Sequence, residues 1–239
     1  MATFVQTNVG LYWGGYSLAS TFNAVGLNLN NNVVDDTVYG DTFQSQAAGS
    51  SSITLEGEGY WDSTNDSVLF TSLGTDDTVV PVTPVDQAVG SRSIFTTLTT
   101  SEYSPFATGT VGEMLAFRIS GEARGEKSVH GEILVAPGSD RTSSGTSAVN
   151  ASIGAVGATE KIYSALHVLS ASGTLEVVVK SDNSSGFSSP TTRITHTSFT
   201  AIGAEMKSTA GAITDDYWRV DFTVSGGGSF DFITSLGII

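Results

Sequence analysis

Residues 217–225 read YWRVDFTVS, and this stretch decides the fold class. Apolar and polar side chains alternate along it without a break. The apolar positions are Trp218, Val220, Phe222 and Val224. A period of two residues is typical of a β-strand that has one buried and one exposed face. We therefore predict a half-buried strand here.

The same period recurs along the rest of the chain, at residues 53–62 (ITLEGEGYWD), 113–120, 129–135 and 174–180. Val and Thr, which favour strands, outweigh the strong helix formers. We predict an all-β fold of antiparallel, sandwich-like sheets.

Helix signals are weak, so at most one or two short helices are expected. The best candidate is residues 65–73, with Asn65 or Asp66 as the N-cap and Gly74 as the stop signal. Residues 84–90 are a second, weaker candidate.

Composition limits the class of protein. The chain has 239 residues, enough for one large β-domain or two small ones, and 39% of them are hydrophobic. It has no cysteine, which excludes disulfides and cysteine-based zinc sites. The formal net charge is −14, from 24 acidic and 10 basic residues. Because phosphate backbones are gripped by clustered Lys and Arg, we expect no tight binding of nucleic acid.

The chain opens with MATFVQTNVG, which lacks the basic and apolar regions of a secretory signal. No run of about 18 apolar residues occurs, so we also expect no membrane span.

A long segment rich in Ser, Gly and Ala, residues 137–159, divides the chain. Long loops in compact domains are uncommon unless they are functional, so we predict either an exposed loop or an arm that reaches a neighbouring subunit. The predicted regions are an N-terminal half, 1–136, the segment 137–159, and a C-terminal β half, 160–239.

The two halves share a faint similarity, because residues 40–74 and 203–237 align without gaps. The longest identical run is TSLG, at residues 71–74 and 234–237. Chance similarity is the simpler explanation, and a diverged duplication is the alternative.

Catalytic and metal-binding patterns are sparse. His130, His167 and His196 lie in strand-like stretches without a nucleophile motif, and no G-x-S-x-G motif occurs. The neighbouring acids Glu56 and Glu58 could suggest a glycosidase, but such pairs are common on exposed strands. We therefore predict that the chain is not an enzyme.

Two turns rich in oxygen ligands could hold Ca²⁺. These are residues 62–66 (DSTND) and the Asn30–Asn32 run with Asp35 and Asp36. Neither has the spacing of a calcium loop, and turns rich in Asp and Asn form without metal. We predict no metal and no cofactor.

The order of several short motifs in residues 14–62 resembles the opening of siphophage major tail proteins, also called tail tube proteins. The matching pieces are Gly15-Tyr16-Ser17-Leu18, Asp35-Asp36-Thr37, Gly40-Asp41-Thr42, Gly49 and Tyr60-Trp61-Asp62. The segment from Asp215 to Phe230 is also similar to phage proteins of this type. The resemblance covers about half of the chain, which is longer than the smaller members of the family.

This resemblance implies a virion protein made in the host cytoplasm that forms hexameric rings, with the inner sheet of each ring closed into a barrel. If the duplication were real, a trimer with pseudo-sixfold symmetry would be plausible. Stacked rings would form a tube that conducts DNA during ejection. The implied partners are further copies of the chain and the tape measure, tail terminator and tail tip proteins.

An acidic lumen would keep DNA from sticking, so acidic residues on exposed strand faces are candidates to line it. These are Glu56, Glu58, Asp62 and Asp221. The alternative interpretation is that they lie on ordinary solvated faces. Other functions left open are a capsid decoration or baseplate protein and, from another class, a carbohydrate-binding module.

Overall fold

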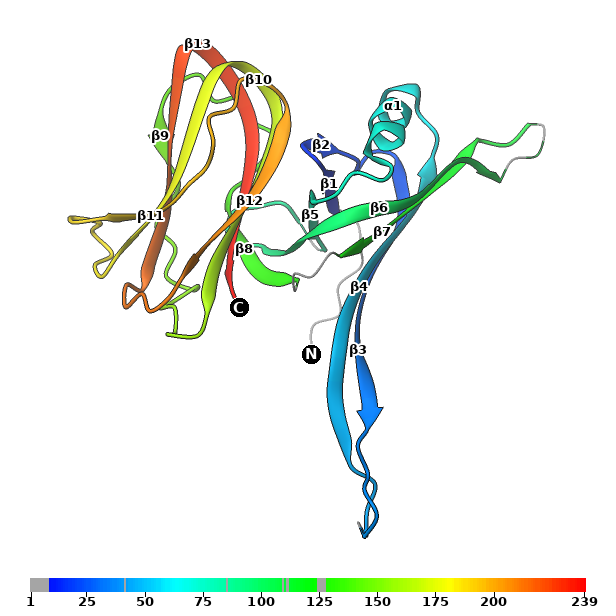
Figure 1. Cartoon of the computed structure of the whole chain (residues 1–239). Coiled ribbons are helices and arrows are strands. Elements are labelled where there is room, and N and C mark those ends of the chain that lie inside the picture. Colours follow the sequence, from blue (N-terminus) through cyan, green and yellow to red (C-terminus); the bar gives the residue numbers. More distant parts are fainter. Residues whose placement is uncertain (1–8, 41, 85, 109, 111, 124–127) are drawn as a thin grey trace. The chain divides into compact units, whose positions relative to one another are not determined.

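The computed structural model describes residues 9–40, 42–84, 86–108, 110, 112–123 and 128–239. Over these residues the chain forms thirteen β-strands and one α-helix. The registers determined between the named strands are all antiparallel. The predicted all-β, antiparallel class is therefore confirmed (Figure 1).

The chain divides into two compact units. The large unit comprises residues 1–20, 78–97 and 128–239, and the small unit comprises residues 21–77 and 98–127. This division differs from the predicted boundaries at 136 and 160. The reason is long-range pairing, because strands from the N-terminal half pair with strands from the C-terminal half within the large unit.

The large unit is built around two long strands. Its strands are β1 (Gly10–Trp13), β2 (Tyr16–Ser17), β5 (Thr78–Thr83), β8 (Val129–Val135), β9 (Gly145–Thr146), β10 (Lys161–Asp182), β11 (Thr191–Thr195), β12 (Gly203–Ala210) and β13 (Tyr217–Ile238). Strands β10 and β13 pair along nearly their whole length, and both lie side by side in Figure 1. Strands β12 and β11 pair with the first and second halves of β10.

The long β10–β13 ribbon changes register twice near its middle, between Val168 and Ser170 and between Ser172 and Thr174. Gly173 lies at this change with a φ of 89°, and a Cβ there would stand 2.5 Å from the carbonyl oxygen of Ser225. Only glycine fits such a position without strain. The register changes allow both halves of the ribbon to supply side chains to one core.

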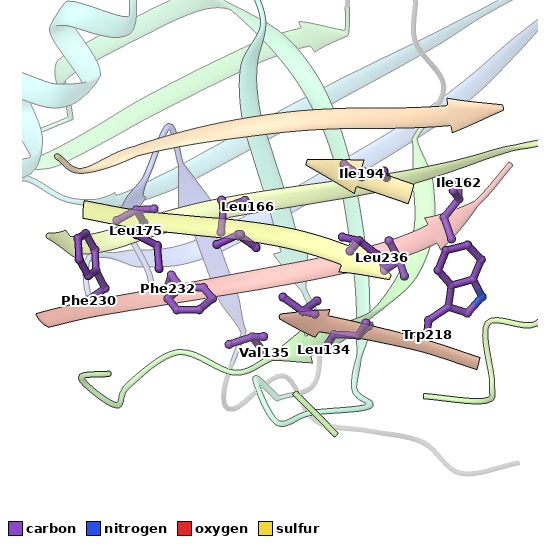
Figure 2. Packing of buried hydrophobic residues seen from close by; sticks show 14 of the residues in the cluster. Leu134, Val135, Ile162, Leu166, Leu175, Ile194, Trp218, Phe230, Phe232 and Leu236 are labelled. Carbon is purple, nitrogen blue, oxygen red and sulfur yellow. The ribbon is translucent and has the colours of Figure 1, made fainter. Parts of the chain in front are cut away.

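That core contains apolar side chains from both halves of the ribbon, as Figure 2 shows. The labelled members are Leu134, Val135, Ile162, Leu166, Leu175, Ile194, Trp218, Phe230, Phe232 and Leu236. Each is at most 3% exposed. Burying one such side chain contributes about 1.5–3 kcal/mol, so this cluster is the main source of stability in the large unit.

Residues 137–159, predicted as a loop or an arm, form a mostly irregular segment that packs on its own chain. The segment runs along β13, with β9 pairing to Phe222 and single bridges from Arg141 to Phe230 and from Asn150 to Trp218. The Trp218 indole N–H donates to the Gly154 carbonyl at 2.7 Å. The polar backbone of this segment thus finds hydrogen-bond partners in its own chain, as expected of the loop alternative.

The small unit is an open antiparallel sheet with one helix. Its elements are β3 (Phe22–Asp35), β4 (Gln46–Tyr60), α1 (Ser63–Ser72), the second half of β6 (Arg92–Thr108) and β7 (Ala116–Ala123). The strand order is β3-β4-β7-β6. Strands β3 and β4 form a hairpin that continues well beyond the other two strands (Figure 1).

Helix α1 confirms the predicted helix at residues 65–73, with a different cap. The N-cap is Asp62, whose side chain accepts hydrogen bonds from the backbone N–H groups of Thr64 and Asn65. Asn65 and Asp66, the predicted caps, lie within the first turn. The second helix candidate, residues 84–90, forms turns and irregular structure over its described residues, and residue 85 lies outside them.

The proposed repeat has no counterpart in the secondary structure. The identical run TSLG lies at the end of α1 and its C-cap at residues 71–74, whereas at 234–237 it lies inside β13. Because the same letters adopt a helix in one place and a strand in the other, the structure favours chance similarity. The trimeric alternative, which depended on the repeat, thereby loses its basis.

Candidate functional site

The strongest candidate site is the exposed face of the small unit's sheet. Along β4 the side chains of Ile53 and Leu55 are buried, whereas Glu56 is exposed and Glu58 partly exposed. The predicted alternation of this strand is therefore confirmed. The side chains of Glu56 and Glu58 project to the same face because they are two residues apart on a strand.

Cross-strand pairing brings further acids to this face. Glu56 lies opposite Ser120 of β7, and Ser120 lies opposite Glu102 of β6. Two pairs further along, and so on the same face, Thr54 lies opposite Glu122. Residues directly opposite each other in a sheet share a face, so Glu56, Glu58, Glu102 and Glu122 form one acidic face. We call these four residues the acidic face.

One basic residue stands among these acids. Arg118 of β7 lies opposite Glu58, and its Nε donates to Glu58 Oε2 at 3.3 Å. Both side chains are well exposed, at 55% and 41%. Exposed ion pairs are weak and screened by salt, so this pair contributes about 0–1 kcal/mol. The acidic face retains a net negative charge.

The acidic face is hollowed where β3 contributes small residues. Ala24 lies opposite Glu58 and Gly26 lies opposite Glu56. The resulting depression measures about 450 Å³ and is lined by Glu56, Glu58, Glu102 and Arg118 among others. The surface therefore presents carboxylates around a shallow groove.

The opposite face of the sheet carries buried apolar side chains. Phe117 and Ile119 of β7 are buried, and the ring of Phe22 meets that of Phe117 edge-on at 5.0 Å. Helix α1 contributes the buried side chain of Leu69. Tyr103 donates from its hydroxyl to Asp66 Oδ1 of the helix at 2.6 Å. Partial burial, together with this bond and the Asp66 charge, raises the pKa of Tyr103, so the phenol remains a donor.

The other two lumen candidates have roles within their own units. Asp62 caps α1, and hydrogen bonds from the backbone of Thr64 and Asn65 lower the pKa of its carboxyl. Asp221 lies in the large unit, where Lys180 Nζ stands 2.7 Å and Arg219 Nε 2.7 Å from its carboxylate. Asp221 is only 18% exposed and is neutralised by these partners, so it adds no free charge to an exposed face.

The β3–β4 hairpin carries unusual exposed apolar residues beyond the sheet. They are Leu29, Val33, Val34, Val38, Tyr39 and Phe43, with exposed fractions from 48% to 110%. Strands β3 and β4 are paired with each other as far as Asp35 and Gln46. Two-stranded hairpins are marginally stable alone in water, so a surface of this kind is typical of an interaction site.

A buried polar cluster in the large unit was not predicted. Ser164 Oγ lies 2.9 Å from His196 Nε2, and His196 Nδ1 lies 3.0 Å from Glu205 Oε2. The Thr197 backbone and hydroxyl also donate to Glu205, and Lys207 Nζ lies 3.2 Å from it. Although partial burial acts to raise it, hydrogen bonds from His196, Thr197 and Lys207 hold the pKa of Glu205 at about 2.

This chain of Ser, His and Glu has the order of a hydrolase triad. However, Ser164 is fully buried, and a nucleophile must reach its substrate. The geometry instead fits a structural link, because Ser164 is in β10, His196 follows β11 and Glu205 is in β12. Sequence reasoning missed it because neither spacing matches a catalytic motif.

Over the described residues, no group of three or more His, Cys, Asp or Glu side chains is arranged to hold a metal ion. In the same part of the chain, no helix is long and apolar enough to cross a membrane.

No protein family profile and no curated protein sequence matches this chain. Solved structures provide remote likenesses. A chain of the virion of a native gene transfer agent particle is 12% identical with a TM-score of 0.41, over 50% of this chain and 92% of that one. A chain of the C6-symmetric tail of an empty gene transfer agent particle is 12% identical with a TM-score of 0.41, over 53% and 96%.

A third likeness extends over nearly the whole chain. The SPP1 Dit (gp 19.1) protein, described as a paradigm of the hub adsorption apparatus in phages that infect Gram-positive bacteria, is 8% identical with a TM-score of 0.35. The match covers 98% of this chain and all of that one. The chain is thus remotely similar in structure to components of phage and gene transfer agent particles.

Proposed function

We propose that this chain is a non-enzymatic structural protein of a phage-type virion, and that its small unit builds a ring of the tail tube. The observation that carries the proposal is an open sheet that combines an acidic, solvent-exposed face with an unpaired edge. The resemblance of residues 14–62 to tail tube proteins points in the same direction, and the ring would be a hexamer by that resemblance.

In this proposal the unpaired edge of β3 forms the contact between neighbouring copies in a ring. Strand β3 is an edge strand, and in the described part of the chain no strand pairs with the side of β3 that faces away from β4. An exposed edge of this length invites pairing with another chain. Pairing of β3 with a neighbouring copy extends the sheet, and a closed ring of copies removes the free edges.

The acidic face explains passage of DNA. With these carboxylates turned toward the lumen, the wall of the tube repels the phosphate backbone. The net charge of −14 has the same sign, so DNA slides through without being gripped. Glu56 and Glu58 remain lumen candidates in this proposal, joined by Glu102 and Glu122.

In this proposal the β3–β4 hairpin forms the contact between stacked rings. The apolar side chains at its far end are covered when they contact the next copy in an assembly. The tape measure, tail terminator and tail tip proteins would bind the completed tube, as the family resemblance implies.

Negative-stain electron microscopy of the purified full chain tests the proposal. We expect rings with a central hole, stacked into tubes at high concentration. Single rings that never stack would favour a baseplate role, and solid trimeric knobs or monomers would favour a decoration protein. Either result would contradict the proposed tail tube role.

A hairpin variant and a control in the large unit sharpen the test. Val33→Lys combined with Val34→Lys places charge on the hairpin, where the two valines are 56% and 48% exposed. We expect at least a tenfold loss of stacked tubes. Val89→Lys changes a valine of similar exposure, 53%, in the large unit and should leave tubes intact. Equal effects of both changes would contradict a stacking role for the hairpin.

A further inference from the structure

The N-terminal hairpin of the large unit is held tightly by its neighbours. Strand β1 pairs with β2 and with β5, and the Gly14 N–H donates to the Val79 carbonyl at 3.1 Å. Within this hairpin Leu11, Trp13 and Leu18 are at most 1% exposed. The hairpin contains the motif Gly15-Tyr16-Ser17-Leu18, which the proposed ring does not use.

One contact of this hairpin involves a titratable group. The Gly15 backbone N–H donates to His167 Nδ1 of β10 at 3.2 Å. Gly15 has a φ of 99°, and a Cβ on it would stand 2.7 Å from the backbone of Gly203. The turn therefore approaches β10 and β12 so closely that only glycine fits there.

His167 is fully buried, and its neutral ring is in a single tautomer. Its Nδ1 accepts a hydrogen bond, so in the neutral ring the proton is on Nε2. Among the described residues, Nε2 has no hydrogen-bond partner. Burial lowers the pKa of His167 from 6.5 to about 3, so the ring is neutral at neutral pH.

In the part of the chain that the structure describes, no carboxylate is hydrogen-bonded or ion-paired with His167. From β1 the ring faces Tyr12, 6.1 Å away, whose pKa is raised by burial and by the Asp231 charge. The Asp231 carboxylate accepts from the Gly138 N–H. On β12, Ala204 lies opposite His167, and the neighbouring Glu205 lies opposite Leu166, which alternation places on the other face.

We propose that His167 is an acid-sensitive lock for the N-terminal hairpin. A proton from solvent that binds Nδ1 removes the acceptor of the Gly15 N–H. The same proton leaves an unpaired positive charge in an apolar core, which favours the state in which the hairpin is undocked and the ring is hydrated.

The pH dependence of hairpin docking follows from the difference between the docked and undocked pKa values of His167. The docked pKa lies below the undocked value, so docking is strongest above pH 6.5 and weakens as the pH falls toward 3. At pH 4.5, two units below the undocked pKa, the docking equilibrium is about 100-fold weaker than at pH 7.5. The Glu205 carboxylate, with a pKa of about 2, stays ionised over this range.

Hydrogen exchange of the full chain tests the lock. The Leu18 N–H, which donates to the Leu11 carbonyl at 2.9 Å, reports hairpin opening. After correction for intrinsic rates, we expect its protection to fall about 100-fold from pH 7.5 to 4.5. The Val177 amide of β10 should remain better protected than Leu18 at both values. Equal protection of the two amides at both pH values means global opening and overturns the lock.

Two variants separate His167 from the other histidines. His167→Gln keeps an acceptor but cannot titrate, so the fall at Leu18 should shrink to less than threefold. His130→Gln, at an exposed position, should retain the 100-fold fall. If His167→Gln does not fold, the proposal is tested by an NMR titration of the unmodified chain labelled with ¹⁵N-histidine. A His167 that titrates above pH 5 while the hairpin stays docked would overturn the proposal.

Discussion

The two units differ in how many of their large apolar side chains are exposed to solvent. In the large unit the ribbon of β10 and β13 buries most of its apolar side chains, the majority of them in one core. In the small unit, many large apolar side chains remain exposed. They are Leu29, Val33, Val34, Val38, Tyr39, Phe43, Tyr60, Phe70, Leu73, Phe106, Met114 and Leu115.

The difference separates stability from assembly. A unit that buries its own apolar surface is stable without partners, whereas exposed apolar side chains and free strand edges are typical of surfaces that other chains cover. Substitutions in the large unit should therefore change the free energy of unfolding, and substitutions on the small unit's surface should change interactions.

Trp218→Ala should lower the free energy of unfolding most. The side chain is fully buried and its indole N–H holds residues 137–159 through Gly154. We expect a loss of about 3–5 kcal/mol, measured by urea unfolding. Trp218→Phe should lose less because most of the volume is kept. A loss below about 1 kcal/mol for the alanine variant would contradict the conclusion that this core stabilises the large unit by itself.

Glu205→Gln should cost about 1–2 kcal/mol at pH 7, because it removes a charged acceptor of several hydrogen bonds. The folded pKa of about 2 lies below the ordinary 4.5, so the contribution is present above pH 4.5 and is lost as the pH falls toward 2. Urea unfolding at pH 7, 4 and 2.5 should show the difference from the unmodified chain shrinking. A constant difference over this range would contradict the assignment.

Asp62→Ala removes the N-cap of α1 and should lower the thermal stability of the small unit. Asp62→Asn, which retains a capping oxygen, is the matched control and should recover most of the loss. Thermal unfolding followed by circular dichroism measures both. Equal losses would mean that charge, and not the cap, is what matters at this position.

Glu56→Lys combined with Glu102→Lys should change stability least, by less than about 0.5 kcal/mol, because both side chains are exposed. The double variant should nevertheless retain DNA on assembled tubes at low salt, measured by co-sedimentation. Glu160→Lys with Glu176→Lys makes the same charge change at exposed positions of the large unit and should retain none. DNA retention by both would show that only net charge matters.

The contrast also shows where sequence reasoning succeeded. The strands at 53–62 and 217–225 were predictable because alternation is a local pattern, and burial of Leu55 and Val220 confirms their inner faces. The helix was predictable from its polar start and from Gly74. Glu56 and Glu58 could be placed on one exposed face for the same reason.

Other features depend on contacts between distant residues. Glu102 and Glu122 join the acidic face only through the pairing of β7 with β4 and β6. Ser164 and His196 are 32 positions apart, and Gly15 and His167 are 152 apart. Such pairs leave no periodic signal in a single sequence.

What the sequence determined by itself was the β class, the inner and outer faces of its clearest strands, the acidic charge and the absence of disulfides. These depend on side-chain chemistry and on a period of two residues, which are local properties. The folded structure was needed to show which strands pair and that residues of the small unit interrupt the chain of the large unit. It was also needed to show that residues 137–159 pack on β13 and that Gly15 donates to His167. The physical reason is that strand pairing and buried hydrogen bonds join residues far apart in the chain, and one sequence read alone does not encode that choice in any local pattern.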